Sequence, residues 1–171
     1  MSGDVRHSGV SQAGRIDLAE AIARDGLGDS HVDDAAVRHL LRQVPLFKRI
    51  GKRHMRSLAG RCQVMRYRPG DPIVRAGFSG EGFFAIAGGR ARVQRSDGHE
   101  VILGHGDFFG DLSLIDGAER NATVVAETDL IALKLTRQTF LDLLDNEPTV
   151  CRALVESLVE RVRAMEERLP P

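Results

Sequence analysis

Hydrophobic and polar residues change their periodicity twice along the chain, from helical to strand-like and back again. In residues 33–44 the apolar positions recur at the three- and four-residue spacing of one helix face, and 52–60 repeats this pattern more briefly. Short apolar runs typical of strands follow at 62–67, 71–76, 82–88, 90–95, 99–104, 121–126 and 130–135. Helical spacing then returns in 138–146 and 148–168.

Turn-forming glycine, proline and Ser-Asp-Gly sequences separate the strand-like runs. Seven or eight short strands so closely spaced predict a compact antiparallel barrel or sandwich and disfavour an α/β sheet. We therefore expect a mainly β domain over 33–168, with N-terminal helices (33–60), an antiparallel β-barrel (61–136) and two C-terminal helices (137–168). Residues 1–32, rich in Gly, Ser, Asp and His, are expected to form a flexible arm.

Charge and cysteine content narrow the class of protein. The 24 Lys and Arg of this 171-residue chain balance 24 Asp and Glu, so no overall field attracts it to nucleic acid or to an anionic membrane. Its apolar runs are shorter than the roughly 20 residues that span a bilayer, and residues 1–17 lack the apolar core of a secretion signal. Cys62 and Cys151 are too few for a disulfide framework or a zinc site, so we expect a cytoplasmic protein with no membrane contact.

The segment 106–125 combines an anion-binding arrangement with a hydroxyl acceptor. Within this all-β region, 112–115 is predicted to form one helical turn, whose N-terminal amides near Gly110 favour an anion. Arg120 returns to the same place with a planar donor fork suited to a phosphate. The carboxylate of Asp111 suits a hydroxyl group such as a ribose 2′-OH. Together these features describe a site for a sugar phosphate.

Two motifs resemble those of cyclic nucleotide-binding domains, the family of catabolite activator protein and the protein kinase A regulatory subunits. The first is Phe109-Gly110-Asp111-Leu112-Ser113-Leu114, followed after five residues by Arg120-Asn121-Ala122-Thr123-Val124. It resembles the family's phosphate-binding cassette, placed here at 108–124. The second motif, the spaced glycines and apolar residues of 73–89, resembles another signature of the family. The resemblance covers about residues 45–168.

The resemblance implies a jelly-roll barrel and a cyclic purine nucleotide as ligand, with cAMP favoured over cGMP and no metal. It places Arg120 at the phosphate and Asp111 at the ribose 2′-OH. Val93 and Leu103 align with positions that touch the purine, although both also suit a plain barrel core. The full set of implied ligand-binding residues is Phe109, Gly110, Asp111, Leu112, Ser113, Arg120, Asn121, Ala122, Thr123, Val93 and Leu103.

Two departures from the family pattern keep a second hypothesis open. Asp111 stands where the family has glutamate, and its side chain is shorter by one bond of about 1.5 Å. Asn121 stands where the family usually has Ala, Ser or Thr, and as both donor and acceptor it leaves the choice of purine open. The alternative is a degenerate domain of the same fold that binds no nucleotide and acts as a protein-interaction or assembly module.

Simpler roles exist for several of the polar residues. Arg120 is also consistent with a surface arginine that pairs with an acidic neighbour: Asp111, Asp116 or Glu119. A third interpretation is a metal-dependent cupin enzyme, suggested by His99, Glu100, His105 and Asp107. The His-x-His pair that a cupin needs is absent, so the sequence favours a protein that is neither an enzyme nor a metal-binding protein.

The last predicted helix carries an apolar stripe at heptad spacing, formed by Val155, Leu158, Val162, Met165 and Leu169. Arg161 and Glu166 flank the stripe, where they would face each other across a parallel pair of helices. The stripe suits either a homodimer or, as the resemblance implies, a lid over the nucleotide base. With no helix-turn-helix after it, we expect no direct DNA binding. We expect instead a stand-alone sensor that signals to an unknown downstream protein by movement or pairing of its C-terminal helices.

Overall fold

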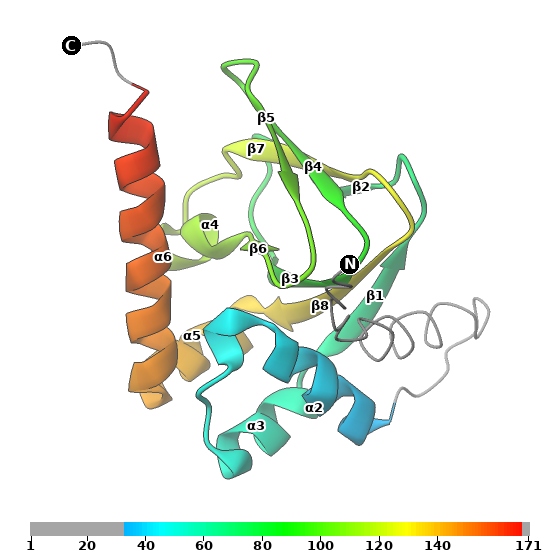
Figure 1. Cartoon of the computed structure of the whole chain (residues 1–171), viewed down its shortest axis with the longest axis vertical. Helices are drawn as coiled ribbons and strands as arrows, with labels where there is room; N and C mark the ends of the chain where they lie inside the picture. Colours follow the sequence, from blue (N-terminus) through cyan, green and yellow to red (C-terminus); the bar gives the residue numbers. More distant parts are fainter. Residues whose placement is uncertain (1–32, 169–171) are drawn as a thin grey trace, which may run out of the picture.

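The computed structural model describes residues 33–168, so the expected arm (1–32) and the stripe residue Leu169 lie outside the described residues. The described elements, in chain order, are α2 (Asp34–Gln43), the 3-10 turn η1 (Pro45–Phe47), α3 (Lys52–Ala59), β1 (Gln63–Tyr67), β2 (Pro72–Val74), β3 (Gly82–Gly88), β4 (Ala91–Arg95), β5 (Glu100–Leu103), β6 (Phe108–Phe109), α4 (Asp111–Asp116), β7 (Ala122–Ala126), β8 (Leu130–Thr136), α5 (Arg137–Asn146) and α6 (Pro148–Glu166) (Figure 1). None of the helices in this range is both long and apolar enough to cross a membrane.

The strands form two antiparallel four-stranded sheets, in the orders β1-β8-β3-β6 and β2-β7-β4-β5. The prediction of a mainly β fold with flanking helices is therefore confirmed. The prediction of a closed jelly-roll barrel is wrong, because the strands form two separate sheets. The sheets share a core yet do not join edge to edge. Strand β6 has only two residues and β2 three, and Pro72 of β2 has no N–H to donate to a neighbouring strand.

Local sequence signals explain where several elements begin. The Asp33 side chain accepts a hydrogen bond from the N–H of Ala35 and caps α2, and Thr136 caps α5 in the same way. Pro148 stands in the first turn of α6, where its missing N–H costs nothing. Each of the seven strand-like runs corresponds to one strand, and β8 extends one residue beyond its run, to Thr136. Strand β6 was not expected, because two residues are too few to show a period.

Strand β3 is buried on both faces and divides the core in two. Phe83 faces the helices, where its ring lies 4.6 Å from that of Phe140 in α5 and 5.7 Å from that of Phe47 in η1. Phe84, the next residue, faces the other sheet and stacks on Phe109 at 5.1 Å. Successive strand residues point to opposite sides, so the helices and the second sheet cover opposite faces of the β1-β8-β3-β6 sheet (Figure 1).

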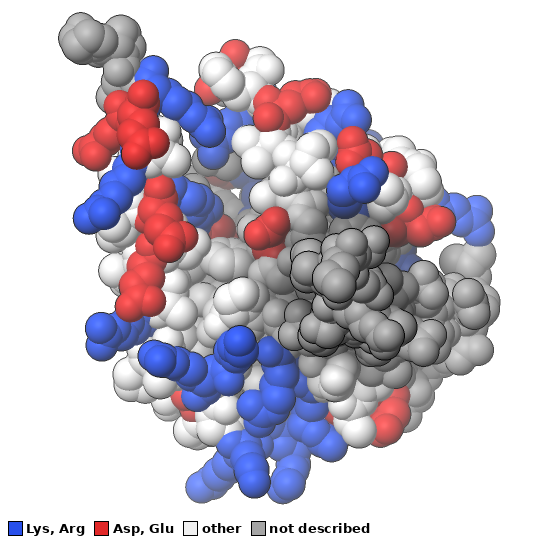
Figure 2. Space-filling model, viewed as in Figure 1, with Lys and Arg blue, Asp and Glu red and all other residues white. Residues whose placement is uncertain are grey.

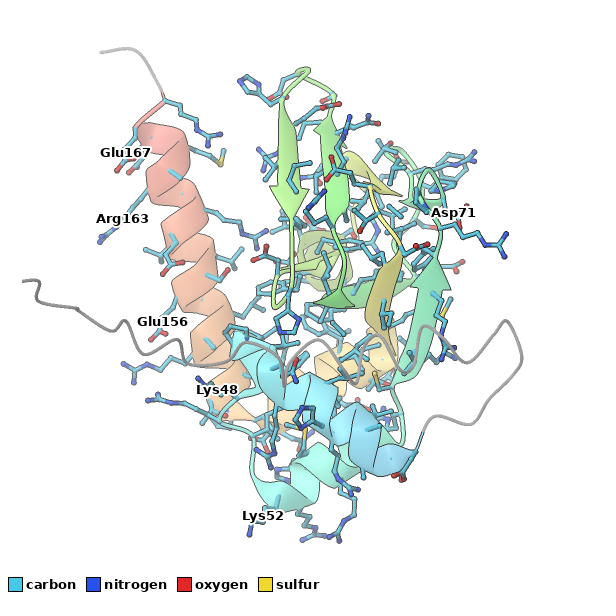
Figure 3. The ribbon with its side chains drawn as sticks, turned by 45° about the vertical axis from the view of Figure 1, so that its right-hand side comes forward. Lys48, Lys52, Asp71, Glu156, Arg163 and Glu167 are labelled. Atoms are coloured by element: carbon cyan, nitrogen blue, oxygen red, sulfur yellow. The ribbon has the colours of Figure 1, made fainter. Side chains whose placement is uncertain are left out.

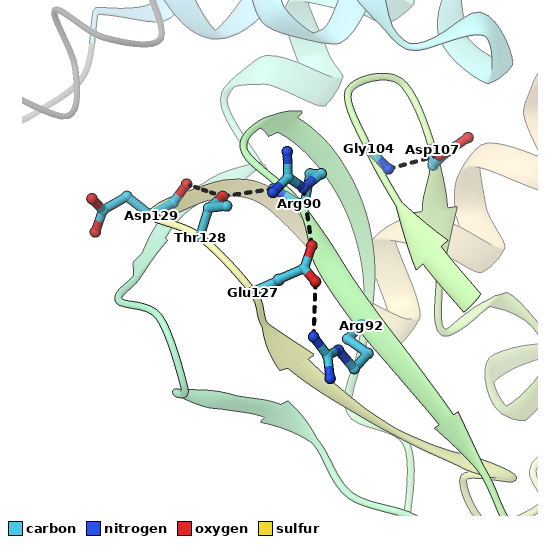
Figure 4. A network of polar contacts seen from close by, with 7 residues as sticks. All are labelled: Arg90, Arg92, Gly104, Asp107, Glu127, Thr128 and Asp129. Atoms are coloured by element: carbon cyan, nitrogen blue, oxygen red, sulfur yellow. Dashed lines mark hydrogen bonds and ion pairs between the residues drawn. The ribbon is translucent and has the colours of Figure 1, made fainter. Parts of the chain in front are cut away.

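A polar network joins β4 to the turn between β7 and β8 (Figure 4). Arg92 and Arg90 donate to the carboxylate of Glu127 at 2.8 and 2.9 Å, and these two hydrogen bonds hold the pKa of Glu127 below its ordinary value. The hydroxyl of Thr128 accepts from the N–H of Arg90 at 3.0 Å. Because the charged groups of this network face solvent, we assign it a role in fixing the turn rather than in global stability.

Candidate functional site

A cavity of about 1040 Å³ opens between helix α6 and the β2-β7-β4-β5 sheet, large enough for a small-molecule ligand. Ten of the eleven residues expected to contact a ligand line it: Val93, Leu103, Phe109, Gly110, Asp111, Leu112, Ser113, Arg120, Asn121 and Ala122. The exception is Thr123, whose Oγ1 accepts a hydrogen bond from the N–H of Ala76 at 3.1 Å. The structure therefore brings residues from β4, β5 and the 109–123 segment into one site.

Arg120 is a buried cation in the wall of this cavity. Its guanidinium donates to Gly110 O at 2.8 Å, to Ser113 Oγ at 2.7 Å and to Gly82 O at 2.5 Å. None of these acceptors is a carboxylate, and no ion pair within residues 33–168 neutralises the charge. Burial lowers the pKa of Arg120, and the nearby Asp111 carboxylate offsets part of that effect. A buried cation without a counter-ion favours an incoming anion.

Two glycines leave room for this arginine and bring the two sequence motifs together. A Cβ on Gly80 would overlap Ser113 Oγ and lie 2.9 Å from Arg120 Cζ. A Cβ on Gly110, where φ is +90°, would lie 2.7 Å from Arg120 Nη1. The N–H of Gly77 also donates to the carbonyl of Arg120 at 2.8 Å. The spaced-glycine motif of 73–89 therefore packs directly against the 109–123 segment.

Asp111 begins α4 with only 2% of its surface exposed, and its carboxylate accepts a hydrogen bond from Arg161 of α6. This ion pair holds the C-terminal helix against the 109–123 segment. The guanidinium carbon of Arg161 also lies 5.9 Å from the centre of the Phe108 ring, which is a cation–π distance. In a parallel pair of helices, Arg161 would face Glu166 of a second chain. In the structure it contacts Asp111 of its own chain, because α6 runs along the cavity.

Comparison with known proteins decides the family. The cyclic nucleotide-binding domain family matches residues 64–147, a range that contains both motifs in which Gly80, Gly110 and Arg120 meet. The chain belongs to the cyclic nucleotide-binding domain family. The resemblance inferred from the two motifs is thereby confirmed.

The relatives include regulatory subunits of protein kinases, a catabolite activator protein, a cyclic nucleotide-gated potassium channel and cGMP-dependent protein kinases. The chain is 35% identical over 117 residues to the cAMP-dependent protein kinase regulatory subunit of Schizosaccharomyces pombe, a match that covers 64% of this chain and 28% of that protein. It is 32% identical to the catabolite activator protein of Thermus thermophilus, whose crystal structure gives a TM-score of 0.63 over 71% of this chain and 60% of that one. The regulatory subunit of a cAMP-independent protein kinase A from Trypanosoma brucei gives 28% identity and a TM-score of 0.65, over 72% of this chain and 46% of that one. The chain thus spans less than two thirds of each relative.

More apolar residues line the domain's cavity than the sequence predicted. Val93 and Leu103 are half-buried, line the cavity and pack against the core between the two sheets. Val101 and Val124 line it too, because each is the direct partner of Val93 on a neighbouring strand. Val74 completes this group of aliphatic residues. Only the strand register reveals these neighbours, and register is not visible in the periodicity of a single strand.

Helix α6 lines the domain's cavity with a face other than the expected apolar stripe. The residues of α6 at the cavity are Pro148, Thr149, Arg152, Ala153, Glu156, Ser157, Glu160, Arg161, Ala164 and Met165. Met165 alone among the described stripe residues is at the cavity, while Val155 and Val162 are 54% and 53% exposed and lie elsewhere. The geometry therefore does not support Val155 or Val162 as a lid, and pairing with a second chain stays a prediction.

The simpler interpretations of the polar residues do not match the geometry. Arg120 is buried and donates its hydrogen bonds to neutral oxygens. The interpretation of Arg120 as a surface arginine paired with Asp111, Asp116 or Glu119 is therefore wrong. His105 Nδ1 lies 2.8 Å from the carbonyl of Ala87, and His99 contacts Asp97. In the part of the chain that the structure describes, no three His, Cys, Asp or Glu side chains group together as metal ligands do.

Proposed function

We propose that this protein is a non-enzymatic cytoplasmic sensor that binds a cyclic purine nucleotide in the cavity beside α6, with cAMP preferred to cGMP. The observation that carries the proposal is the buried guanidinium of Arg120, which contacts no carboxylate within residues 33–168. A cyclic phosphate diester supplies one negative charge and two acceptor oxygens to such a group. The preference for cAMP rests on relatives named for that nucleotide.

The cavity offers a separate place for each part of such a nucleotide. The phosphate lies beside Arg120 and Gly110, where the absence of a side chain lets the backbone approach closely. The ribose 2′-OH donates to Asp111, whose two carboxylate oxygens have lone pairs enough for both a hydroxyl and Arg161. The purine lies against the aliphatic wall that includes Val93 and Leu103.

The Asp111–Arg161 ion pair gives a physical route from the ligand to α6. A hydroxyl that donates to Asp111 shares the carboxylate with Arg161 and shifts the position of the acceptor that holds Arg161. A ligand shifts the position of a helix only when it binds the two positions with different affinity. We therefore place the signal in the movement of α6 relative to the 109–123 segment, passed to a downstream protein.

The outer face of α6 offers a way for two copies to pair. Its apolar side chains Val155, Val159 and Val162 are about half exposed along one helix. Apolar residues at this spacing pack into a second helix in coiled coils. In our proposal the protein forms a homodimer through α6, and Val155→Glu/Val162→Glu gives a monomer in light scattering at concentrations where the wild type is a dimer. A wild type that is monomeric at every concentration measured would contradict the proposed homodimer.

The test of the nucleotide site is a thermal shift with matched arginine variants. Ligand at about one hundred times its dissociation constant stabilises a protein by about 2.7 kcal/mol, or roughly 5–10 °C for a domain of this size. Saturating cAMP therefore raises the Tm of the wild type and of the exposed variant Arg75→Ala, but not that of Arg120→Ala. Equal shifts in all three proteins contradict the site.

A nucleotide-free interaction module is the second candidate, and one observation favours it. Arg120 already donates to three protein oxygens and Asp111 already pairs with Arg161, so both groups are satisfied within the chain. One relative is the regulatory subunit of a cAMP-independent kinase, which supports a role for this fold outside cAMP binding. If no cyclic nucleotide shifts the Tm of the wild type, this candidate replaces the sensor.

A further inference from the structure

The surface around α3 holds a concentration of positive charge that extends beyond the nucleotide cavity. Five of the nine residues in 48–56 are exposed lysines or arginines, which we call the α3 patch: Lys48, Arg49, Lys52, Arg53 and Arg56. No aspartate or glutamate occurs in the sequence between Asp34 and Asp71, although the whole chain has no net charge. Figure 2 shows Lys and Arg gathered over this end of the molecule.

The charges at the start of α3 do not serve the stability of that helix. Gly51 gives the helix no side-chain cap, and Lys52 and Arg53 occupy its first turn. The first turn is the positive end of the helix dipole, where acidic residues stabilise and basic residues destabilise. Within residues 33–168 no side chain of the α3 patch makes an ion pair or a hydrogen bond. Residues that oppose local stability in this way are expected where a surface binds something.

We propose that the α3 patch binds an acidic segment of a protein partner, a short stretch rich in aspartate or glutamate. Arginine makes paired hydrogen bonds with carboxylates, and three of the five residues are arginines. The eight-residue helix is about 12 Å long, which matches a short peptide.

An extended anionic surface fits this patch less well than a short acidic segment. Glu156 of α6 lies above Lys48, so a duplex or a bilayer that extends past the patch meets negative charge (Figure 3). The stretch 48–56 contains no Phe, Tyr or Trp on which bases could stack. Its two large apolar residues, Ile50 and Met55, are buried, which leaves no side chain to enter a bilayer.

The α3 patch also lies next to the junction of the two C-terminal helices. His54 of α3 contacts the buried carboxylate of Glu147, the residue between α5 and α6. A partner on the patch therefore sits beside the point from which α6 departs. Lys48 and Arg49 also line the cavity, whereas Lys52, Arg53 and Arg56 do not. The proposal can therefore be tested at Lys52 and Arg53 without changing the cavity wall.

The test compares two variants with the same net charge. Lys52→Glu/Arg53→Glu changes the patch, and Arg68→Glu/Arg75→Glu changes two exposed arginines elsewhere; each takes the net charge of the chain from 0 to −4. Fluorescence anisotropy measures binding of a labelled peptide of about twelve residues with alternating Glu and Ala. Exposed ion pairs are individually weak, so we expect about a tenfold loss of affinity in the patch variant and under about threefold in the matched variant.

Thermal unfolding shows that the patch variant is folded, and its Tm is expected to equal or exceed that of the wild type because glutamate suits the first turn of α3. Three outcomes overturn the proposal. The wild type binds no peptide, or both variants lose affinity equally, or duplex DNA or phosphatidylserine vesicles bind the wild type more tightly than the peptide does.

Discussion

Arg161 of helix α6 donates a hydrogen bond to the buried carboxylate of Asp111, fifty residues earlier in the chain. The contact joins the C-terminal helix to the segment that also holds Arg120. Its two ends differ, because Asp111 is buried while the Arg161 side chain is 37% exposed. The ion pair therefore anchors a half-exposed helix to a buried acid at the edge of the cavity.

Arg161→Ala is expected to destabilise the fold. Loss of Arg161 leaves the buried Asp111 carboxylate without its partner, and such losses cost about 1–3 kcal/mol. Urea unfolding of the variant measures the change in the free energy of unfolding. The matched variant is Arg163→Ala, which removes an exposed arginine on the outer side of α6 (Figure 3). Equal changes in the two variants would contradict a role for the ion pair.

The role of Asp111 toward a ribose hydroxyl is tested with a ligand that lacks it. Losing one hydrogen bond to a charged acceptor costs about 1.5–3 kcal/mol, so 2′-deoxy-cAMP is expected to bind the wild type at least about tenfold more weakly than cAMP. The variant Asp111→Ala is expected to bind cAMP and 2′-deoxy-cAMP with about the same affinity. This holds even where the substitution weakens the binding of both ligands. A ratio of the two affinities that stays at tenfold shows that the hydroxyl binds elsewhere.

Gly110→Ala is expected to abolish cyclic nucleotide binding by displacing Arg120. The added Cβ would lie 2.7 Å from both Arg120 Nη1 and the carbonyl of Gly82. Gly98→Ala is the matched variant, since Gly98 has a similar positive φ of +82° but no neighbour within 4 Å. Both variants carry the strain of a left-handed residue, roughly 1 kcal/mol. Calorimetric titration that finds equal affinities would contradict the close packing at Gly110.

Cys62 is expected to make the free energy of unfolding depend on pH in the alkaline range. Burial raises its pKa to about 12 from an ordinary value of 9.0. The folded state therefore keeps the thiol proton above pH 9 while the unfolded state loses it, so this stability is present below pH 9 and is lost as the pH rises toward 12. Between about pH 8 and pH 10 the wild type is expected to lose about 1.4 kcal/mol more than Cys62→Ala. Urea unfolding at the two pH values measures the difference, and equal losses would contradict it.

Much of the fold followed from local sequence signals. The strand-like runs and the helical spacing of 33–44 and 148–168 depend only on residues close together in the chain. Whether the sheets close depends on hydrogen bonds between distant edge strands, and the short β2 and β6 do not provide them. The barrel was predicted wrongly for that reason.

The candidate site was also predicted only in part from the sequence. Arg120 and Gly110 were found because their motif is local and each residue type has a specific chemistry. The ion pair of Asp111 with Arg161 was missed, since it depends on the direction in which α6 leaves α5. The neighbours of Val93 across the sheet were missed because they depend on register. Long-range packing sets both features.

The decisive measurement is calorimetric titration of the full chain with cAMP and with cGMP, each to millimolar concentration. A cyclic nucleotide sensor is expected to give saturable heat with micromolar or tighter affinity, at one nucleotide per chain, and with cAMP the tighter ligand. Arg120→Ala, titrated in parallel, is expected to give none. Absence of heat with both nucleotides, together with no change in Tm, would contradict nucleotide binding and leave the interaction module as the function of this fold.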